Sequence, residues 1–272
     1  MQLSAASPAL GSLLNNAAQA QGLGTDYDVI VLGAGVAGLA AAERLVNLDS
    51  ELKVLVLEAR NRIGGRVYSV PHQGSSRDAE LGAMELKQAA GKNWPLIARL
   101  GLTVDEFPDA SIGFYPGMSA LVRALAESST GRVQLDSEVR EVFWREGLVG
   151  VKYMNRGLSS AVTGRRLIVT LPAGVLRSGA LAINPAFPAS KVNALQSLAL
   201  DSVVSLAMLF PGGSGALKDP KQPWLFQDDT SRLRAFPVND AGEVLLEAQF
   251  EGARAELLSP QPEELQFSLA IR

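Results

Sequence analysis

The sequence predicts a fold of the α/β class, with a βαβ unit and a parallel sheet near the N-terminus and a partial, sheet-rich part behind it. Tyr27–Leu32 (YDVIVL) is a β-branched, apolar run that predicts a buried parallel strand. A glycine-rich turn and the helix-forming run LAAAERLV come next, and Lys53–Leu57 (KVLVL) predicts a second strand. Strand, helix and strand in this order form the repeating unit of a parallel sheet.

Composition and charge exclude several classes of function. The chain has 272 residues, 47% of them apolar and 19% charged, which is typical of a globular protein with a buried core. Its 25 basic and 28 acidic residues give a net charge of −3, so no basic surplus predicts a nucleic-acid partner. The absence of cysteine excludes disulfides and a cysteine nucleophile, and with His72 as the single histidine no metal site is predicted. No run approaches the roughly 20 apolar residues of a membrane-spanning helix.

Residues 1–24 are expected to be a leader-like or disordered segment. The first 21 residues carry no charge, and Ala18–Ala20 form a small-x-small triplet like the cleavage region of a secretory leader. The pattern is similar to the end of a twin-arginine leader whose basic pair would precede Met1. The expected location is periplasmic if such a region exists and cytoplasmic otherwise. The alternative is a disordered terminus rich in Ala and Ser.

A nucleotide site is predicted between the first strand and its helix. Gly33, Gly35 and Gly38 form a G-x-G-x-x-G turn, in which the first glycine permits the tight turn, the second lets a pyrophosphate approach, and the third lets helix and strand pack. The helix N-terminus offers free N–H groups to phosphates. Glu58, at the end of the second strand, is placed to accept hydrogen bonds from ribose hydroxyls and disfavours NADP. The alternative is a glycine turn that serves packing alone.

The segment after Glu58 distinguishes between dinucleotides. It reads EARNRIGGRV, and the stretch DVIVLGAGVAGLAAAERL…VLVLEARNRIGGRV resembles the flavin amine oxidases, which include monoamine, polyamine and L-amino acid oxidases. The resemblance implies an FAD-binding Rossmann-type domain and the oxidative deamination of an amine or L-amino acid, with dioxygen reduced to peroxide. FAD is expected to bind non-covalently, because a cysteinyl-flavin bond is impossible here. An NAD-dependent dehydrogenase is the alternative that the R-x-G-G-R run opposes.

The resemblance also implies domain boundaries and site residues. We expect an FAD-binding domain at 25–182, with a short helical excursion near 91–127, and a partial substrate domain at 183–272. Ala79–Met84 (AELGAM) resembles the turn that passes the flavin ring in this family, although a strand end with a glycine turn is the alternative. The implied cofactor contacts are Gly33, Gly35, Val36, Ala37, Gly38, Glu58, Ala59, Arg60, Gly65, Arg66, Gly82, Ala83, Met84 and Val139.

Substrate and catalytic residues are less defined. Glu85 stands where L-amino acid oxidases commonly carry a carboxylate-binding arginine, so it favours an ammonium group; the alternative is a solvated glutamate opening a helix. Many of these oxidases place a lysine near the flavin on the strand that corresponds to Ser202–Phe210, and Ser205 is the nearest position here. No catalytic residue is assigned. His72 is expected to be a polar loop residue, with a flavin link as the alternative.

The chain departs from the family in two further respects. Only about fifteen residues stand where family members carry a long helical insertion, between Leu102 and Gly117, and the second glycine motif and aromatic pair of the family's C-terminal portion are absent from this sequence. The alternative function is therefore an FAD-binding but catalytically incomplete subunit, or a degenerate relative, that needs a second chain. A homo-oligomer is also open.

The remaining pattern predicts a succession of short elements. Helices are expected at Asn93–Leu102, Met118–Glu127, Ala189–Leu200 and from Gly252, with a loop rich in Pro and Gly over Asp105–Gly117. Strands are expected at Arg132–Trp144, Leu148–Met154, Arg166–Leu171, Ser202–Phe210, Trp224–Phe226 and Glu243–Phe250.

Overall fold

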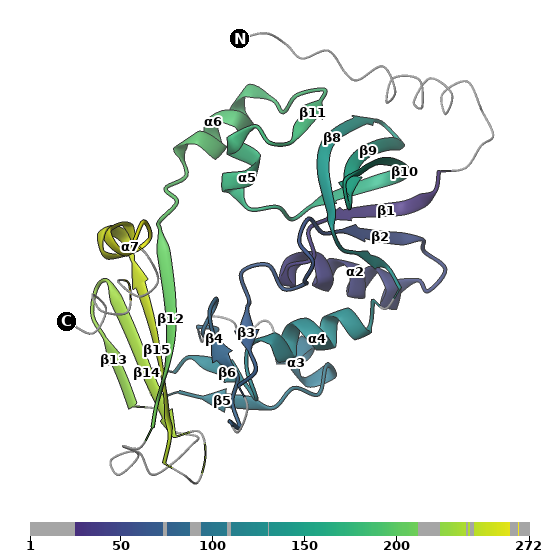
Figure 1. Ribbon diagram of the computed structural model, residues 1–272. Helices are drawn as coiled ribbons and strands as arrows, with labels where there is room; N and C mark the ends of the chain where they lie inside the picture. Colours follow the sequence, from purple (N-terminus) through teal and green to yellow (C-terminus); the bar gives the residue numbers. More distant parts are fainter. Residues whose placement is uncertain are drawn as a thin grey trace. The chain divides into compact units, whose positions relative to one another are not determined.

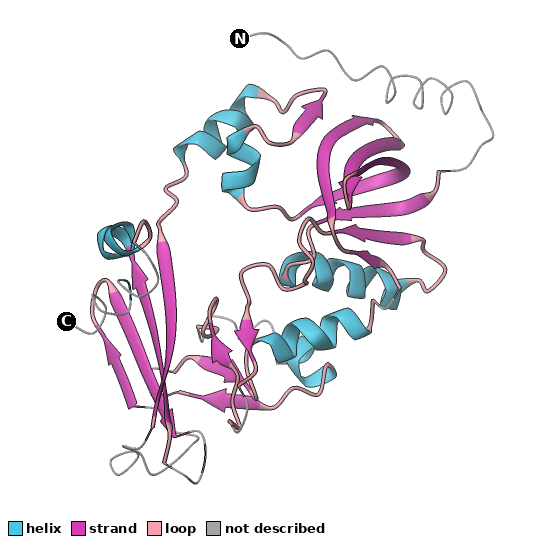
Figure 2. Ribbon diagram, in the orientation of Figure 1, coloured by secondary structure: helices cyan, strands magenta, loops and turns pink. Residues whose placement is uncertain are grey.

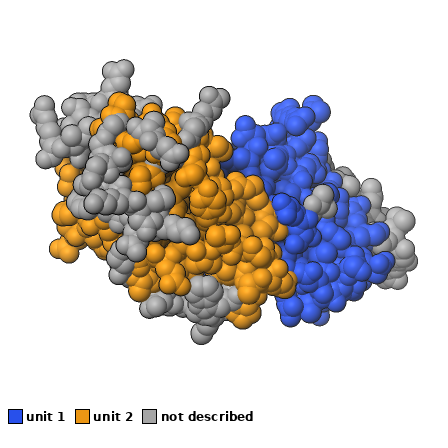
Figure 3. All heavy atoms as spheres, turned by 90° about the horizontal axis from the view of Figure 1, so that it is seen from below, with its two compact units in different colours: residues 1–65, 125–199 blue, residues 66–124, 200–272 orange. Residues whose placement is uncertain are grey.

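The computed structural model describes residues 25–72, 75–87, 94–107, 110–129, 131–211, 224–237, 239, 242–261 and 266. The leader-like segment at 1–24 lies outside these residues. The chain divides into two compact units (Figure 3). Unit 1 comprises residues 1–65 and 125–199, and unit 2 comprises residues 66–124 and 200–272.

Unit 1 is built on a seven-stranded mixed sheet (Figures 1 and 2). The strand order is β11-β8-β9-β10-β1-β2-β7, in which β10, β1, β2 and β7 run parallel and β8, β9 and β10 form an antiparallel meander. Its strands are β1 (Tyr27–Leu32), β2 (Val54–Leu57), β7 (Val133–Gln134), β8 (Ser137–Arg145), β9 (Leu148–Asn155), β10 (Leu158–Val169) and β11 (Ala182–Asn184). Its helices are α2 (Val36–Leu48), α5 (Ala173–Ser178) and α6 (Ala189–Ser197).

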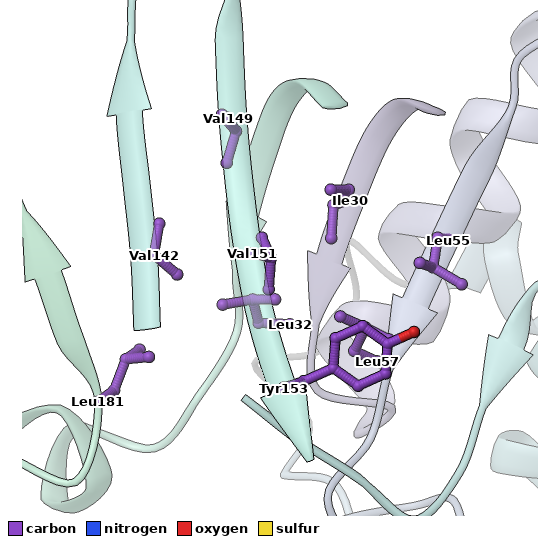
Figure 4. Close-up of a cluster of buried hydrophobic side chains, with 9 residues drawn as sticks. All are labelled: Ile30, Leu32, Leu55, Leu57, Val142, Val149, Val151, Tyr153 and Leu181. Atoms are coloured by element: carbon purple, nitrogen blue, oxygen red, sulfur yellow. The ribbon is translucent and has the colours of Figure 1, made fainter. Parts of the chain in front are cut away.

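The two faces of the parallel strands are covered by different elements. Ile30 and Leu32 on β1 pack with Leu57 on β2 against side chains of the meander such as Val151 (Figure 4). Val31 points to the other face, because side chains alternate along a strand, and α2 contacts β1 and β2. The prediction of a buried, parallel βαβ unit at Tyr27–Leu57 is confirmed.

Unit 2 contains a four-stranded antiparallel sheet and two short hairpins. The sheet order is β12-β15-β14-β13, with helix α7 against β12 and β15. Its strands are β12 (Val203–Phe210), β13 (Trp224–Gln227), β14 (Ser231–Pro237) and β15 (Val244–Glu251), and its hairpin strands are β3 (Ser69–Val70), β4 (Ala79–Glu80), β5 (Val104–Glu106) and β6 (Ile112–Phe114). Its helices are α3 (Trp94–Arg99) and α7 (Gly252–Leu258), and α4 (Ser119–Glu127) spans the division between the units.

One face of the unit 2 sheet carries charged side chains in its interior. Cross-strand partners share a face of an antiparallel sheet, so the register places three residues in each row across β12, β15 and β14. The rows are Ser205–Gln249–Arg232, Ala207–Glu247–Arg234 and Leu209–Leu245–Phe236. Leu245 and Phe236 pack with Phe107, whereas Ala248 and Phe250 on the opposite face pack with Leu258 of α7.

Several sequence predictions differ from the structure. Asp105–Gly117 is not a simple loop, because β5 and β6 pair as a hairpin within it. The strand expected at Arg166–Leu171 begins earlier, at Leu158, and β14 was not predicted. The units also do not follow the expected division at 182/183, since residues 66–124 cluster with 200–272, where β4 contacts β12 and β15. The assignment of 25–182 to FAD binding stays a prediction. Within the described residues, no helix is long and apolar enough to cross a membrane.

Candidate functional site

The glycine-rich loop of unit 1 joins β1 to the N-terminus of α2. Gly33 has φ +101°, a conformation that only glycine adopts without strain, and its N–H donates to the Leu57 carbonyl at 2.8 Å. A Cβ on Gly38 would lie 1.9 Å from the Gly33 carbonyl oxygen. The loop therefore requires glycine at both positions for its own folding.

Gly35 is different, because neither its backbone conformation nor its neighbours among the described residues require glycine there. Its φ of −73° and ψ of 176° suit any residue, and the nearest atoms that its Cβ would meet lie 4.0 Å away. It is the N-cap of α2 and leaves the first N–H groups of the helix, including those of Val36 and Ala37, without a side-chain cap. A helix N-terminus without a side-chain cap, with its positive dipole end, fits a phosphate.

Glu58 lies directly beside this loop with its carboxylate held from two directions. The Ala34 N–H donates to Oε2 at 2.8 Å, and the Arg60 N–H donates to Oε1 at 3.0 Å. Glu58 is buried, and each of its oxygens keeps a further lone pair. This arrangement fits a ribose that offers its hydroxyls to a fixed acceptor.

The R-x-G-G-R run returns to the glycine-rich loop. Gly64 forms a parallel bridge with Gly35 and donates from its N–H to the Ala34 carbonyl at 2.8 Å, and Gly65 has φ +59°. Ala59 and Arg60 are exposed beside it. The R-x-G-G-R run therefore lies against the glycine-rich loop. The role of each of its residues as an FAD contact stays a prediction.

Val139 lies on β8, where the strand passes the end of β2. The Ser137 N–H donates to the Glu58 carbonyl at 2.7 Å, and the Asp136 N–H donates to the Arg60 carbonyl at 3.0 Å. A register irregularity follows Val139 on this strand. Gly33–Gly38, Glu58–Arg60, Gly65 and Val139 are thus brought together in unit 1.

The second predicted cofactor segment, Gly82–Met84, lies in unit 2 as a turn after β4. The Ala83 N–H donates to the Arg66 carbonyl at 2.9 Å, and a Cβ on Gly82 would lie 2.1 Å from that same oxygen. Met84 is buried. This geometry is that of a strand end followed by a glycine turn. Whether the turn contacts the flavin ring stays a prediction.

A network of buried charges surrounds this turn. The Glu80 N–H donates to Glu247 Oε1 at 2.8 Å, Arg234 Nη2 donates to Glu247 Oε2 at 2.8 Å, and Arg234 Nη1 donates to the Met84 carbonyl at 2.9 Å. The Glu80 carboxyl accepts hydrogen bonds from the Met118 N–H and the Ser69 hydroxyl. Burial raises the pKa of Glu80 to about 7 and also raises the pKa of Glu247.

Glu85 is not a solvated glutamate, because only 8% of its side chain is exposed. Its carboxylate pairs with Arg232 and accepts a hydrogen bond from the Ser111 hydroxyl at 2.9 Å. Burial and the charge of Arg234 lower the pKa of Arg232. Glu85 and Arg232 line a hollow of about 330 Å³ with Ala83, Met84, Gln249 and Asp228.

Ser205 and His72 border a larger hollow in the same unit. Its volume is about 570 Å³, and the wall is mostly apolar, with Tyr68, Leu81 and Leu209 among its side chains. Ser205 Oγ lies 3.4 Å from Gln249 Nε2, which also donates to the Gly82 carbonyl at 3.3 Å. His72 is an exposed loop residue on the same wall, as predicted.

Sequence reasoning missed the side chains that hold the turn: Arg234, Glu247 and Gln249. Alternation in LLEAQF does place Glu247 and Gln249 on one face of a strand, and this signal was present. It does not show that the face is buried.

Comparisons with known proteins agree with this geometry. Residues 31–99 match the NAD(P)-binding Rossmann-like domain, and residues 110–266, more than half of the chain, match the flavin containing amine oxidoreductase family. A lysine-specific histone demethylase 1 homolog of Arabidopsis thaliana is 35% identical over 50% of this chain and 23% of its own length. An L-amino-acid oxidase of Mus musculus is 43% identical over 29% of this chain and 12% of its own. The matched part thus spans less than a quarter of the length of these relatives.

Solved structures share the fold. The cyclohexylamine oxidase of Brevibacterium oxydans matches with a TM-score of 0.70 at 14% identity, over 89% of this chain and 79% of its own. Wild-type putrescine oxidase bound to putrescine matches with a TM-score of 0.66 at 15% identity, over 88% and 79%. At this identity the likeness concerns the fold alone. The family match over more than half of the sequence, on a fold shared with amine oxidases, shows that the chain belongs to the flavin containing amine oxidoreductase family.

Proposed function

We propose that this chain binds FAD without a covalent bond and serves in the oxidative deamination of an amine or L-amino acid. The observation that carries the proposal is a contrast within the glycine loop. Gly33 has a left-handed φ and a Cβ on Gly38 would meet backbone at 1.9 Å, whereas a Cβ on Gly35 would meet Gly64 and Gly65 at an ordinary contact distance of 4.0 Å. A phosphate that approaches the backbone closely gives Gly35 a role that packing does not.

The residues present fit FAD in two parts. The N–H groups at the start of α2 would hold the pyrophosphate, and Glu58 would accept hydrogen bonds from the adenosine ribose. The Gly82–Met84 turn would support the flavin ring with backbone, because a side chain at Gly82 has no room. When bound, FAD supplies the hydride acceptor and passes the electrons to dioxygen, while the protein orients and encloses the substrate.

The substrate class stays open between amines and amino acids. Glu85 alone would attract an ammonium group, but its pairing with Arg232 offsets that charge. The wall of this hollow also carries Lys87, Asp228, Asp229 and Glu251, so its acidic side chains outnumber its basic ones. Its net charge therefore favours an ammonium group over a carboxylate, and a test needs substrates from both classes.

Anaerobic reduction tests the proposed activity. The purified chain is loaded with FAD, desalted and mixed without air with a monoamine, a diamine and an L-amino acid in turn. Bleaching of the flavin absorption by at least one class is expected. If dithionite bleaches the bound flavin but no substrate of either class does, the proposed activity is wrong.

A second candidate is flavin binding without oxidase turnover, which Ser205 favours. Many members of the family that the sequence resembles carry a lysine near the flavin on this strand. This chain has Ser205 there, and its hydroxyl contacts Gln249. Peroxide release separates the two candidates. Turnover in air that yields peroxide supports the oxidase. A flavin that the substrate bleaches without air, and that air then does not reoxidise, supports the second candidate.

A further inference from the structure

The turn at Glu80–Met84 is held by side chains from a single face of the unit 2 sheet. Glu247 and Gln249 are two residues apart on β15, and Arg234 is the cross-strand partner of Glu247 on β14. They bond the Glu80 N–H, the Gly82 carbonyl and the Met84 carbonyl. Every second residue of the turn is therefore anchored through its backbone.

The anchoring pair is costly to bury. The side chains of Arg234 and Glu247 are each only 2% exposed. Removing two charges from water carries a large desolvation cost, and well-packed apolar residues often serve stability as well or better. The guanidinium also lies 4.9 Å from the ring centroid of Phe107, which fixes its plane.

The backbone contacts distinguish this pair from an ordinary core ion pair. Arg234 bridges Glu247 and the Met84 carbonyl with two nitrogens of one guanidinium, and Glu247 bridges Arg234 and the Glu80 N–H with its two oxygens. An apolar replacement could fill the same volume but could make neither backbone bond.

We infer that Arg234, Glu247 and Gln249 form a clamp that fixes the backbone of the Glu80–Met84 turn, and that they are positioning residues for the flavin ring. The second half of this inference rests on the proposed function, whereas the first half concerns the protein alone. Without the clamp, the turn loses its bonds to Arg234 and Glu247 and keeps those of the Glu80 carboxyl and the Ala83 N–H. It then opens more readily, so part of its ordering falls to the flavin on binding.

The double variant Arg234→Met/Glu247→Leu tests the clamp, because it removes both charges together and leaves neither unpaired. The matched control is Asp105→Asn, which weakens the buried 2.9 Å salt bridge between Arg77 and β5 and keeps Arg77, whose charge acts on Glu247. The probe is the Ala83 amide, whose hydrogen bond is to the Arg66 carbonyl and not to a substituted side chain. The amides of β15 report on the sheet itself.

In the clamp variant, we expect hydrogen exchange at Ala83 to accelerate about tenfold or more, a change of about 1.4 kcal/mol, while exchange along β15 stays within about twofold of wild type. FAD affinity should fall by about the same tenfold factor. The control variant should keep both quantities near wild type.

Two results would overturn the inference. One is a clamp variant in which β15 stays protected and Ala83 exchanges as in wild type, which would make the pair a packing element only. The other is equal acceleration at Ala83 in the control. A wild-type chain that does not bind FAD would remove the proposed function and the flavin role, and the exchange at Ala83 would still decide whether the clamp exists.

Discussion

At the scale of single residues, the three loop glycines have separable roles. Gly38 must be glycine because a Cβ there would lie 1.9 Å from the Gly33 carbonyl oxygen. A Cβ on Gly35 would meet no atom so close. The G-x-G-x-x-G pattern assigns all three glycines to nucleotide binding. The structure separates the two that the fold requires from the one that a ligand would require.

Alanine at Gly38 should therefore destabilise the protein, whereas alanine at Gly35 should not. Gly38→Ala should lower the free energy of unfolding by about 3 kcal/mol, because the new methyl group overlaps backbone. Gly35→Ala should leave it unchanged or raise it by about 0.5 kcal/mol, because it restricts the unfolded chain at a compatible position. Urea unfolding of the two variants measures both. A Gly35→Ala variant as unstable as Gly38→Ala would show that Gly35 also serves packing.

Glu80 should make stability depend on pH. Burial raises its pKa from 4.5 to about 7, so the folded state holds the proton more tightly than the unfolded state. Stability is therefore lost as the pH rises through this range, by about 3 kcal/mol for this group between pH 4 and pH 8. Glu80→Gln keeps an acceptor for the Met118 N–H and removes the charge.

The measurement compares the change in the free energy of unfolding between pH 4 and pH 8 in the wild type and in Glu80→Gln. Between pH 4 and pH 8, the free energy of unfolding of the variant should change by about 3 kcal/mol less than that of the wild type. The variant should be the more stable relative to wild type at pH 8. Identical pH profiles would contradict the assignment. Glu247 faces the same site and contributes in the same direction, but it is common to both proteins.

At the scale of elements, helix α7 packs on the sheet through one side of its surface only. Leu258 is 3% exposed and packs with Leu206 and Phe250, whereas the neighbouring Leu257 is 71% exposed. Leu258→Ala should cost about 3 kcal/mol of stability. Leu257→Ala should stay within about 0.5 kcal/mol of wild type. Thermal unfolding of this pair of variants is the measurement, and equal losses would contradict the packing of α7 on the sheet.

The elements also show what periodicity can and cannot predict. The first βαβ unit was predictable because its strands are continuous apolar runs and its turn has a fixed glycine pattern. β14 was not, because SRLRAFP places arginines on alternate residues, which is typical of a solvent-facing side. Arg234 is nevertheless 2% exposed, since its partner Glu247 lies 13 residues away on β15. Tertiary pairing of this kind leaves no local signal.

At the scale of the whole molecule, the candidate site was predictable by motif and not by contact. The loop at Gly33–Gly38, Glu58 and the R-x-G-G-R run were found from spacing, and the structure brings the loop, Glu58 and Gly64 together in unit 1. The pairing of Glu85 with Arg232 was beyond the sequence, because a lone glutamate after a glycine turn does not indicate its burial. The grouping of residues 66–124 with residues 200–272 has no local signal in the sequence either.

The measurement that tests the account most directly is FAD affinity in the wild type and in Gly35→Ala, by visible absorption after equilibrium dialysis. The wild type should retain FAD in preference to NAD and NADP, and Gly35→Ala should bind FAD at least about tenfold more weakly while unfolding like the wild type. A wild type that retains no FAD, or a Gly35→Ala variant of unchanged affinity, would contradict the claim that the loop at Gly35 is the phosphate site.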